Sequence, residues 1–209
     1  VTGAHAFAAP FVSGKDSLNN EYLGSDGERH SVPPTLVITA VAHVPNANRT
    51  VTGDLKTPGN TLILVGRTLP EFGGSHAAMV CNAQSTCVPT FDEQSPTNYR
   101  AVHALMLQQK IRACHDCSEG GLGVAIAEMA MAGRHGVEIN VASSLINDWW
   151  YFSESCGRFI LEVKHESAAS IRERFGEDAQ IIGHVVADQV VSLGYGQSLA
   201  VEEMLTSWQ

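Results

Sequence analysis

The amino-acid sequence predicts a mixed α/β (α+β) fold in which a β-rich segment precedes an α/β layer. Two observations carry this prediction. After residue 60, short runs rich in β-branched and other apolar residues alternate with segments of helical periodicity. The chain has 209 residues, 44% of them hydrophobic, which is enough to bury a substantial core.

The first quarter of the chain reads as one helix, two strands and the turns between them. Residues 4–9 are small and compatible with a helix, and residues 11–17 read as a short strand that ends in a glycine loop. Residues 23–34 have turn chemistry throughout. The run 35–44 (TLVITAVAHV) predicts a strand buried on at least one face. The polar, Gly/Pro-punctuated segment 46–60 is the best candidate for a domain boundary.

The remainder alternates between strands and helices, as expected for an α/β layer. Apolar positions near helical spacing predict helices over 96–113, from Gly121 to Gly133, and over 167–176. Apolar runs predict strands at 61–68, 137–142, 157–163 and 179–186.

Composition excludes several classes of function. The net charge of −9 opposes non-specific binding to nucleic acid or to an anionic membrane. No apolar run reaches the roughly 18–20 residues needed to span a bilayer. Five cysteines, an odd number without a disulfide framework, favour free thiols in a reducing compartment. We therefore expect a cytoplasmic protein, and the start at Val1 in the middle of an element suggests a piece of a longer chain.

The stretch 113–133 (ACHDCSEGGLGVAIAEMAMAG) admits two interpretations. Cys114-x-x-Cys117 has the spacing of zinc and redox sites, but a structural zinc needs four ligands and no second CxxC exists. Alternatively, Ser118, Gly120 and Gly121 form a loop at a helix start. Exposed N–H groups and the helix dipole could there hold a phosphate, although such glycines also serve tight packing.

Residues 13–17 (SGKDS) form a second candidate site. Gly14 follows an apolar run, Lys15 could neutralise a phosphate, Asp16 could bind a divalent cation, and Ser17 offers a hydroxyl. The order of these residues is not that of a Walker A loop, and a solvated turn would have the same composition.

Residues 152–159 (FSESCGRF) form a third candidate site. Glu154 and Ser155 precede Arg158, which could pair with a phosphate or carboxylate, or take part in an ordinary surface ion pair.

Taken together, the order and spacing of these stretches resemble the phosphoribosylformylglycinamidine synthase family of the aminoimidazole ribonucleotide (AIR) synthetase superfamily. The resemblance covers about residues 5–186 and matches the C-terminal half of the synthetase. It implies that 1–50 are the β-rich end of a truncated A domain, and that 55–209 are a whole AIR synthetase-like B domain of α/β type.

The resemblance also implies an activity and its ligands. Family members convert formylglycinamide ribonucleotide, ATP and glutamine-derived ammonia into the amidine, ADP and phosphate in purine biosynthesis. By likeness, Gly14, Lys15, Ser118, Gly120 and Gly121 would bind ATP, and Asp16 would bind Mg²⁺. The implied substrate contacts are Ser17, Glu154, Ser155 and Arg158, although Cys156 stands where the related loop has Gln.

The implied partners are the N-terminal half of the synthetase, which carries the family's catalytic histidines, and a glutaminase domain or subunit. The fragment alone is therefore expected to be inactive, and the strand edge at 35–44 is expected to promote homodimers. Two alternatives stay open: a non-catalytic half that binds nucleotide as a scaffold, and a zinc or redox module on Cys114 and Cys117.

Overall fold

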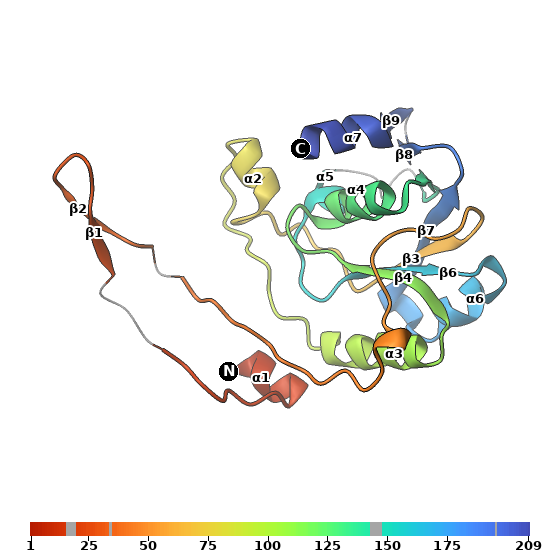
Figure 1. The fold of residues 1–209 in the computed structure, drawn as a ribbon, viewed down its shortest axis with the longest axis horizontal. Coiled ribbons are helices and arrows are strands. Elements are labelled where there is room, and N and C mark those ends of the chain that lie inside the picture. Colours follow the sequence, from red (N-terminus) through yellow and green to blue (C-terminus); the bar gives the residue numbers. More distant parts are fainter. Residues whose placement is uncertain (16–19, 34, 143–147, 195) are drawn as a thin grey trace. The chain divides into compact units, whose positions relative to one another are not determined.

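The computed structural model describes residues 1–15, 20–33, 35–142, 148–194 and 196–209. The chain divides into two compact units, Val1–Ala47 and Asn48–Gln209, and each is described by itself. Figure 1 shows their elements.

The first unit contains a helix and a hairpin. The helix α1 spans Thr2–Phe7, and strands β1 (Glu21–Leu23) and β2 (Arg29–Ser31) pair antiparallel. The ring of Tyr22 stacks on that of His30, with 5.3 Å between centroids. The turn between the strands lies within the segment read from sequence as turn chemistry alone, so the short flanking strands were missed.

Two strands predicted in the first unit are wrong. Residues 11–15 and 35–44 belong to no strand, and the end of the first prediction, residues 16–17, lies outside the described residues. Leu36 is 84% exposed, and Val37, Ile38 and Val41 are exposed as well. An apolar run favours the extended backbone, but a strand forms only where a neighbour accepts and donates its hydrogen bonds.

The second unit is built on a mixed sheet of seven strands in the order β4-β6-β3-β7-β5-β8-β9. All neighbours pair antiparallel except β5 and β8, which are parallel. The strands are β3 (Thr61–Val65), β4 (Ile111–Asp116), β5 (Gly136–Ile139), β6 (Phe159–Val163), β7 (Ala179–Val186), β8 (Val190–Gly194) and β9 (Gln197–Ala200).

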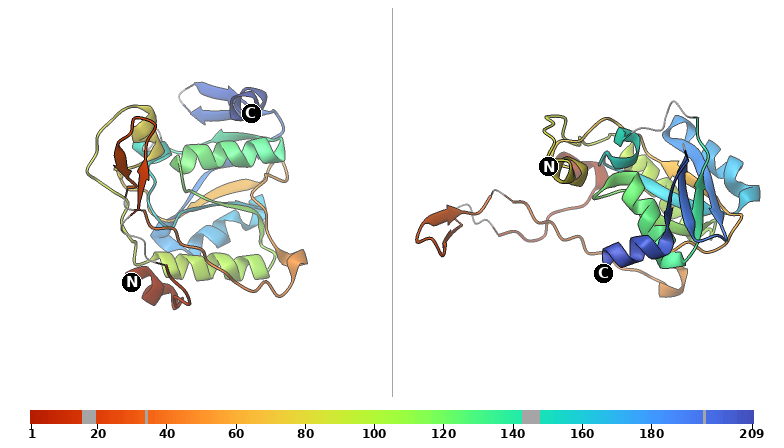
Figure 2. Two further views of the ribbon diagram at one scale, coloured as in Figure 1. Left: turned by 60° about the vertical axis from the view of Figure 1, so that its left-hand side comes forward. Right: turned by 90° about the horizontal axis from the view of Figure 1, so that it is seen from above.

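Helices cover both faces of this sheet (Figure 2), and alternation along the central strands divides the core in two. Leu62 and Leu64 of β3 pack in a cluster with α4 (Gly121–Gly133) and α5 (Asp148–Phe152). Ile63 and Val65 pack on the opposite face with α3 (Ser95–Leu107) and α6 (His165–Glu173). The remaining elements are α2 (His76–Val80), α7 (Val201–Trp208) and the short 3-10 helices Ala47–Arg49 and Gly176–Asp178.

The structure confirms the predicted fold class and corrects one boundary. The helix predicted over 96–113 ends at Leu107, and Ile111–Asp116 forms edge strand β4. Gln109, with φ of 56°, makes the turn between them. The apolar spacing of Leu105 and Ile111 fitted one helix, but both side chains reach the same cluster from different elements. Within the described ranges, no helix is long and apolar enough to span a bilayer.

Candidate functional site

The loop 116–121 connects the end of β4 to the start of α4. The N–H of Cys117 donates to the carbonyl of Arg158 at 3.0 Å, and the N–H of Gly121 donates to the carbonyl of Ser118 at 3.0 Å. Gly120 and Gly121 have φ of 77° and 68°, values that glycine adopts without strain. A Cβ on Gly121 would lie 2.3 Å from the carbonyl oxygen of Ser153, so this position also requires glycine for space.

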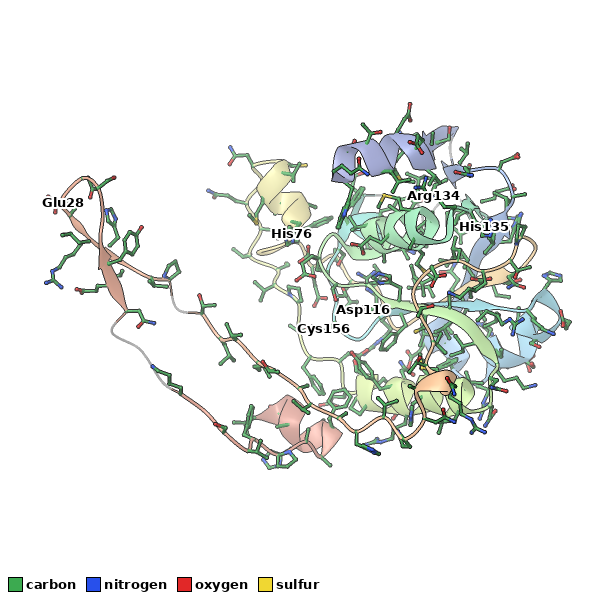
Figure 3. All side chains as sticks on the ribbon, in the orientation of Figure 1. Glu28, His76, Asp116, Arg134, His135 and Cys156 are labelled. Carbon is green, nitrogen blue, oxygen red and sulfur yellow. The ribbon has the colours of Figure 1, made fainter. Side chains whose placement is uncertain are left out.

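A pocket of about 550 Å³ opens beside this loop, within the size range of small-molecule sites. It combines loop residues with the start of α2, the first turns of α4 and the end of α7. Figure 3 labels Asp116 and His76, which line it from two different segments. The polar and aromatic lining residues are His76, His115, Asp116, Ser118, Glu119, Glu128 and Trp208, together with Gly120.

Glu154 holds two of these segments together. Its Oε1 accepts the N–H of Gly120 at 2.8 Å and the N–H of His76, also at 2.8 Å. The imidazole Nδ1 of His76 lies 3.4 Å from the same oxygen. A carboxylate at a helix start is favoured because it complements the partial positive charge there. The Gly120 amide predicted to face a phosphate therefore already has an anionic acceptor in this structure.

The lining of this pocket is acidic, with the carboxylates of Asp116, Glu119 and Glu128, and it is called the acidic pocket below. Ser118 Oγ donates to the carboxylate of Asp116, whose side chain is 61% exposed. The ring of His115 lies between Asp116 and Glu128, with Nε2 at 3.3 Å from Glu128 Oε2. Among the described residues, no group of three or more His, Cys, Asp or Glu side chains could by itself hold a metal ion. An exposed carboxylate can still complete the shell of Mg²⁺ carried by phosphate oxygens.

Ser155 and Arg158 lie inside the protein. Arg158, only 1% exposed, donates to the carbonyls of Ser155 and Ser153 and to the hydroxyl of Thr68. The Ser155 hydroxyl is bonded to the backbone of Leu69. Burial lowers the pKa of the Arg158 guanidinium. In this structure Arg158 is therefore not in a surface ion pair, and its predicted contact with an anion stays a prediction. A substrate could touch Ser155 or Arg158 only if the network opened.

The loop around residue 15 belongs to the first unit. Gly14 and Lys15 lie in neither a helix nor a strand, and a Cβ on Gly14 would meet no atom within 4 Å. The predicted metal ligand Asp16 and the predicted phosphate contact Ser17 lie outside the described residues. Their part in a site thus stays a prediction.

The cysteine pair does not resemble a redox or zinc centre. Burial raises the pKa of both Cys114 and Cys117 to about 12, so both thiols are protonated at neutral pH. The thiolate is the form that attacks disulfides and binds zinc. Both residues are free thiols, Cys117 buried and Cys114 half-buried, as the sequence-based expectation of free thiols has it.

Sequence reasoning missed four residues that line the pocket. His115 stands inside the quoted stretch, and His76 follows the Gly-rich turn at 73–75, so both were visible as polar residues near loops. Glu128 lies two helical turns after Gly121, a spacing that would have indicated its face of α4. Trp208 comes from α7, a helix that no signal in the sequence connected to this loop.

Known proteins match this chain over most of its length. The family model "AIR synthase related protein, C-terminal domain" matches residues 57–196. Phosphoribosylformylglycinamidine synthase subunit PurL of Limosilactobacillus reuteri is 31% identical over 208 residues, which cover 97% of this chain and 27% of the relative. The chain thus spans little more than a quarter of that relative's length.

Solved structures share the fold. PurL of Thermotoga maritima complexed with FGAR superposes with a TM-score of 0.64 at 17% identity, covering 76% of this chain and 30% of that one. The same protein complexed with ATP gives a TM-score of 0.60 at 15% identity, covering 76% and 27%. Sequence and fold agree, and the chain belongs to the AIR synthase related family, as a C-terminal domain of the kind found in phosphoribosylformylglycinamidine synthase.

Proposed function

We propose that this chain is part of a phosphoribosylformylglycinamidine synthase and that its 116–121 pocket belongs to the ATP and substrate site. The reaction would join glutamine-derived ammonia to formylglycinamide ribonucleotide at the expense of ATP. The observation that supports this proposal is the pocket itself, a cavity of about 550 Å³ at the start of α4 with Ser118 and Gly120 in its wall. The family match and the ATP and FGAR complexes of a related fold add to it.

The residues of the pocket would bind and orient rather than react. Phosphoryl transfer asks a protein mainly for positioning and charge neutralisation. The carboxylates of Asp116, Glu119 and Glu128 repel a bare phosphate, so the nucleotide would arrive with Mg²⁺. Asp116 would hold the cation together with phosphate oxygens. Ser118 would donate its hydroxyl to a phosphate oxygen in place of Asp116.

Other parts of the proposal rest on likeness to the family. Gly14 and Lys15 would contact the nucleotide, Asp16 the metal and Ser17 the substrate phosphate. Of the loop 153–158, Glu154 lies nearest the pocket through its bond to Gly120, and it is the proposed substrate contact. The N-terminal half of the synthetase and a glutaminase would complete a cytoplasmic enzyme.

One observation favours a second candidate, a nucleotide-binding scaffold without turnover. The Gly120 N–H already donates to the Glu154 carboxylate, and the Gly121 N–H donates to the Ser118 carbonyl. Arg158 is bonded within the protein. When the donors of a site are already hydrogen-bonded within the protein, the site is stable without a ligand. Such donors add less stabilisation to a transition state. Such a half would hold a nucleotide for the structure of the whole enzyme.

The test is steady-state kinetics of the complete enzyme that contains this chain. We expect Ser118→Ala and Asp116→Asn each to lower kcat/KM for ATP by about tenfold or more, since each removes a charged or hydrogen-bonding contact to the nucleotide. Ser170→Ala is the matched control, because this exposed hydroxyl donates to the carbonyl of Ser167 on α6 and does not line the pocket. Its kinetics should equal those of the wild type.

The same variants separate the two candidates. Suppose that a variant keeps its turnover but loses a nucleotide that remains bound to the wild type through purification. That result would contradict the catalytic proposal and favour the scaffold. Unchanged turnover and unchanged nucleotide content would contradict both.

A further inference from the structure

The second unit has another pocket, of about 570 Å³, at the end of β4 opposite the 116–121 loop. It lies between the segment 48–56, the end of α3, the first residues of β4 and Lys164 after β6. Four of its ten lining residues are cationic, namely Arg49, Lys56, Arg112 and Lys164, and none is acidic. We propose that this pocket binds a small phosphorylated anion, a function separate from that of the acidic pocket.

The charge of this pocket contrasts with that of the chain. The protein carries a net charge of −9 and has 13 lysines and arginines, so four of them around one cavity form a concentrated positive field. Lys56 pairs with Asp54, and Lys164 lies 3.7 Å from Glu166. Within the described part of the chain, no ion pair engages Arg49 or Arg112. Two guanidinium groups therefore remain to meet an anion.

The wall of the pocket is held from inside the protein. Glu162 of β6 is fully buried, and its carboxylate accepts the N–H of Lys56 at 2.8 Å and that of Thr57 at 3.1 Å. These bonds fix the backbone from which the Lys56 side chain extends. Gln109 lines the pocket in a left-handed conformation, with φ of 56°, that costs a side-chain-bearing residue about 1 kcal/mol. The backbone at these positions is thus fixed by contacts within the protein.

The lining also indicates the class of ligand. Guanidinium groups form paired hydrogen bonds with phosphate oxygens, and Arg49 and Arg112 provide two such groups. Val51, Met106 and Ile111 line the same pocket and add apolar surface, which suits the carbon skeleton of a small organic phosphate. Pyrophosphate is the simplest probe, since it carries several negative charges and no body that could bind through other contacts.

The test is isothermal titration calorimetry of the complete protein with inorganic pyrophosphate, at low and at physiological ionic strength. We expect saturable binding, with the dissociation constant raised about tenfold by Arg112→Gln or Arg49→Gln, and loss of this binding event in the double variant. Both arginines are exposed, so neither substitution should affect folding. Lys110→Gln is the matched control. This lysine lies two residues before Arg112, just ahead of β4, carries the same charge, and does not line the pocket.

Three results would overturn the proposal: no saturable binding of pyrophosphate at millimolar concentration, binding that the double variant leaves intact, or an equal loss in Lys110→Gln, which would reveal diffuse attraction only. Tighter binding of an acidic peptide than of pyrophosphate would also overturn it, in favour of a protein surface. Binding that survives Ser118→Ala would show that the anion site is independent of the proposed function.

Discussion

The two units of this chain use similar apolar sequences in opposite ways. In the second unit, the run Thr61–Val65 is buried throughout and pairs on both sides, with β6 and β7. In the first unit, the equally apolar run 35–44 belongs to no strand and is exposed. Both sequences favour an extended backbone, but only Thr61–Val65 has neighbouring strands within its own unit. Partners, rather than propensity, decide which of the two becomes a strand.

The largest expected contrast is between glycines of the two units. A Cβ on Gly121 would lie 2.3 Å from one backbone oxygen and 2.8 Å from another, at a φ of 68°. We expect Gly121→Ala to lower the free energy of unfolding by about 3 kcal/mol or more, through backbone strain and overpacking together. Gly14→Ala, where a Cβ meets nothing, should change it by less than about 0.5 kcal/mol. Denaturant unfolding of both variants measures the difference, and equal values would contradict the described loop.

A second contrast uses leucines of the two apolar runs. Leu62 is 1% exposed, so Leu62→Ala should lower the free energy of unfolding by about 2–5 kcal/mol. Leu36→Ala should leave the free energy of unfolding nearly unchanged, since this side chain already faces solvent. A loss above about 1 kcal/mol at Leu36 would show that the run 35–44 is covered in solution, and would restore the predicted strand.

The smallest expected effect is on the pH dependence of the free energy of unfolding, and it comes from two thiols of the second unit, Cys114 and Cys117. Folding raises the pKa of Cys114 and Cys117 to about 12 from an ordinary value near 9, because burial penalises the thiolate. The stabilisation is complete below pH 9 and is lost as pH rises toward 12, since only the unfolded chain ionises in between. Cys114→Ala and Cys117→Ala should each flatten this decline, by about 1 kcal/mol at pH 10. Unfolding curves from pH 8 to pH 11 measure it, and an unchanged slope would mean that the thiols are not shielded.

The sequence alone predicted much of the second unit but less of the first. Periodicity located β3, β6, β7 and the helix after Gly121, because each of these elements buries a face that its own residues reveal. It missed β4, since Leu105 and Ile111 can meet in one cluster from one helix or from two elements. It also missed α7, whose Val201 is buried only through contacts made elsewhere in the fold.

The candidate site shows the same division. A loop with Ser118 and Gly120 at a helix start was predictable from local chemistry, and so was the positive φ of Gly120. The bond from Gly120 to Glu154 was not, since it joins residues 34 positions apart. Arg158 illustrates the limit further. Its charge suggested a ligand or a surface pair, but only the three-dimensional structure shows that backbone carbonyls surround it.

A single oxygen of Glu154 accepts hydrogen bonds from two backbone N–H groups at the starts of different helices. Because both bonds depend on one carboxylate, they limit how a ligand could bind in the acidic pocket. A ligand that drew Glu154 away from Gly120 would also remove the acceptor of the His76 N–H at the start of α2. Entry is therefore selective by geometry as well as by charge. A ligand that displaced this carboxylate would have to supply acceptors for the N–H groups of both Gly120 and His76 to leave the two helix starts as stable as before.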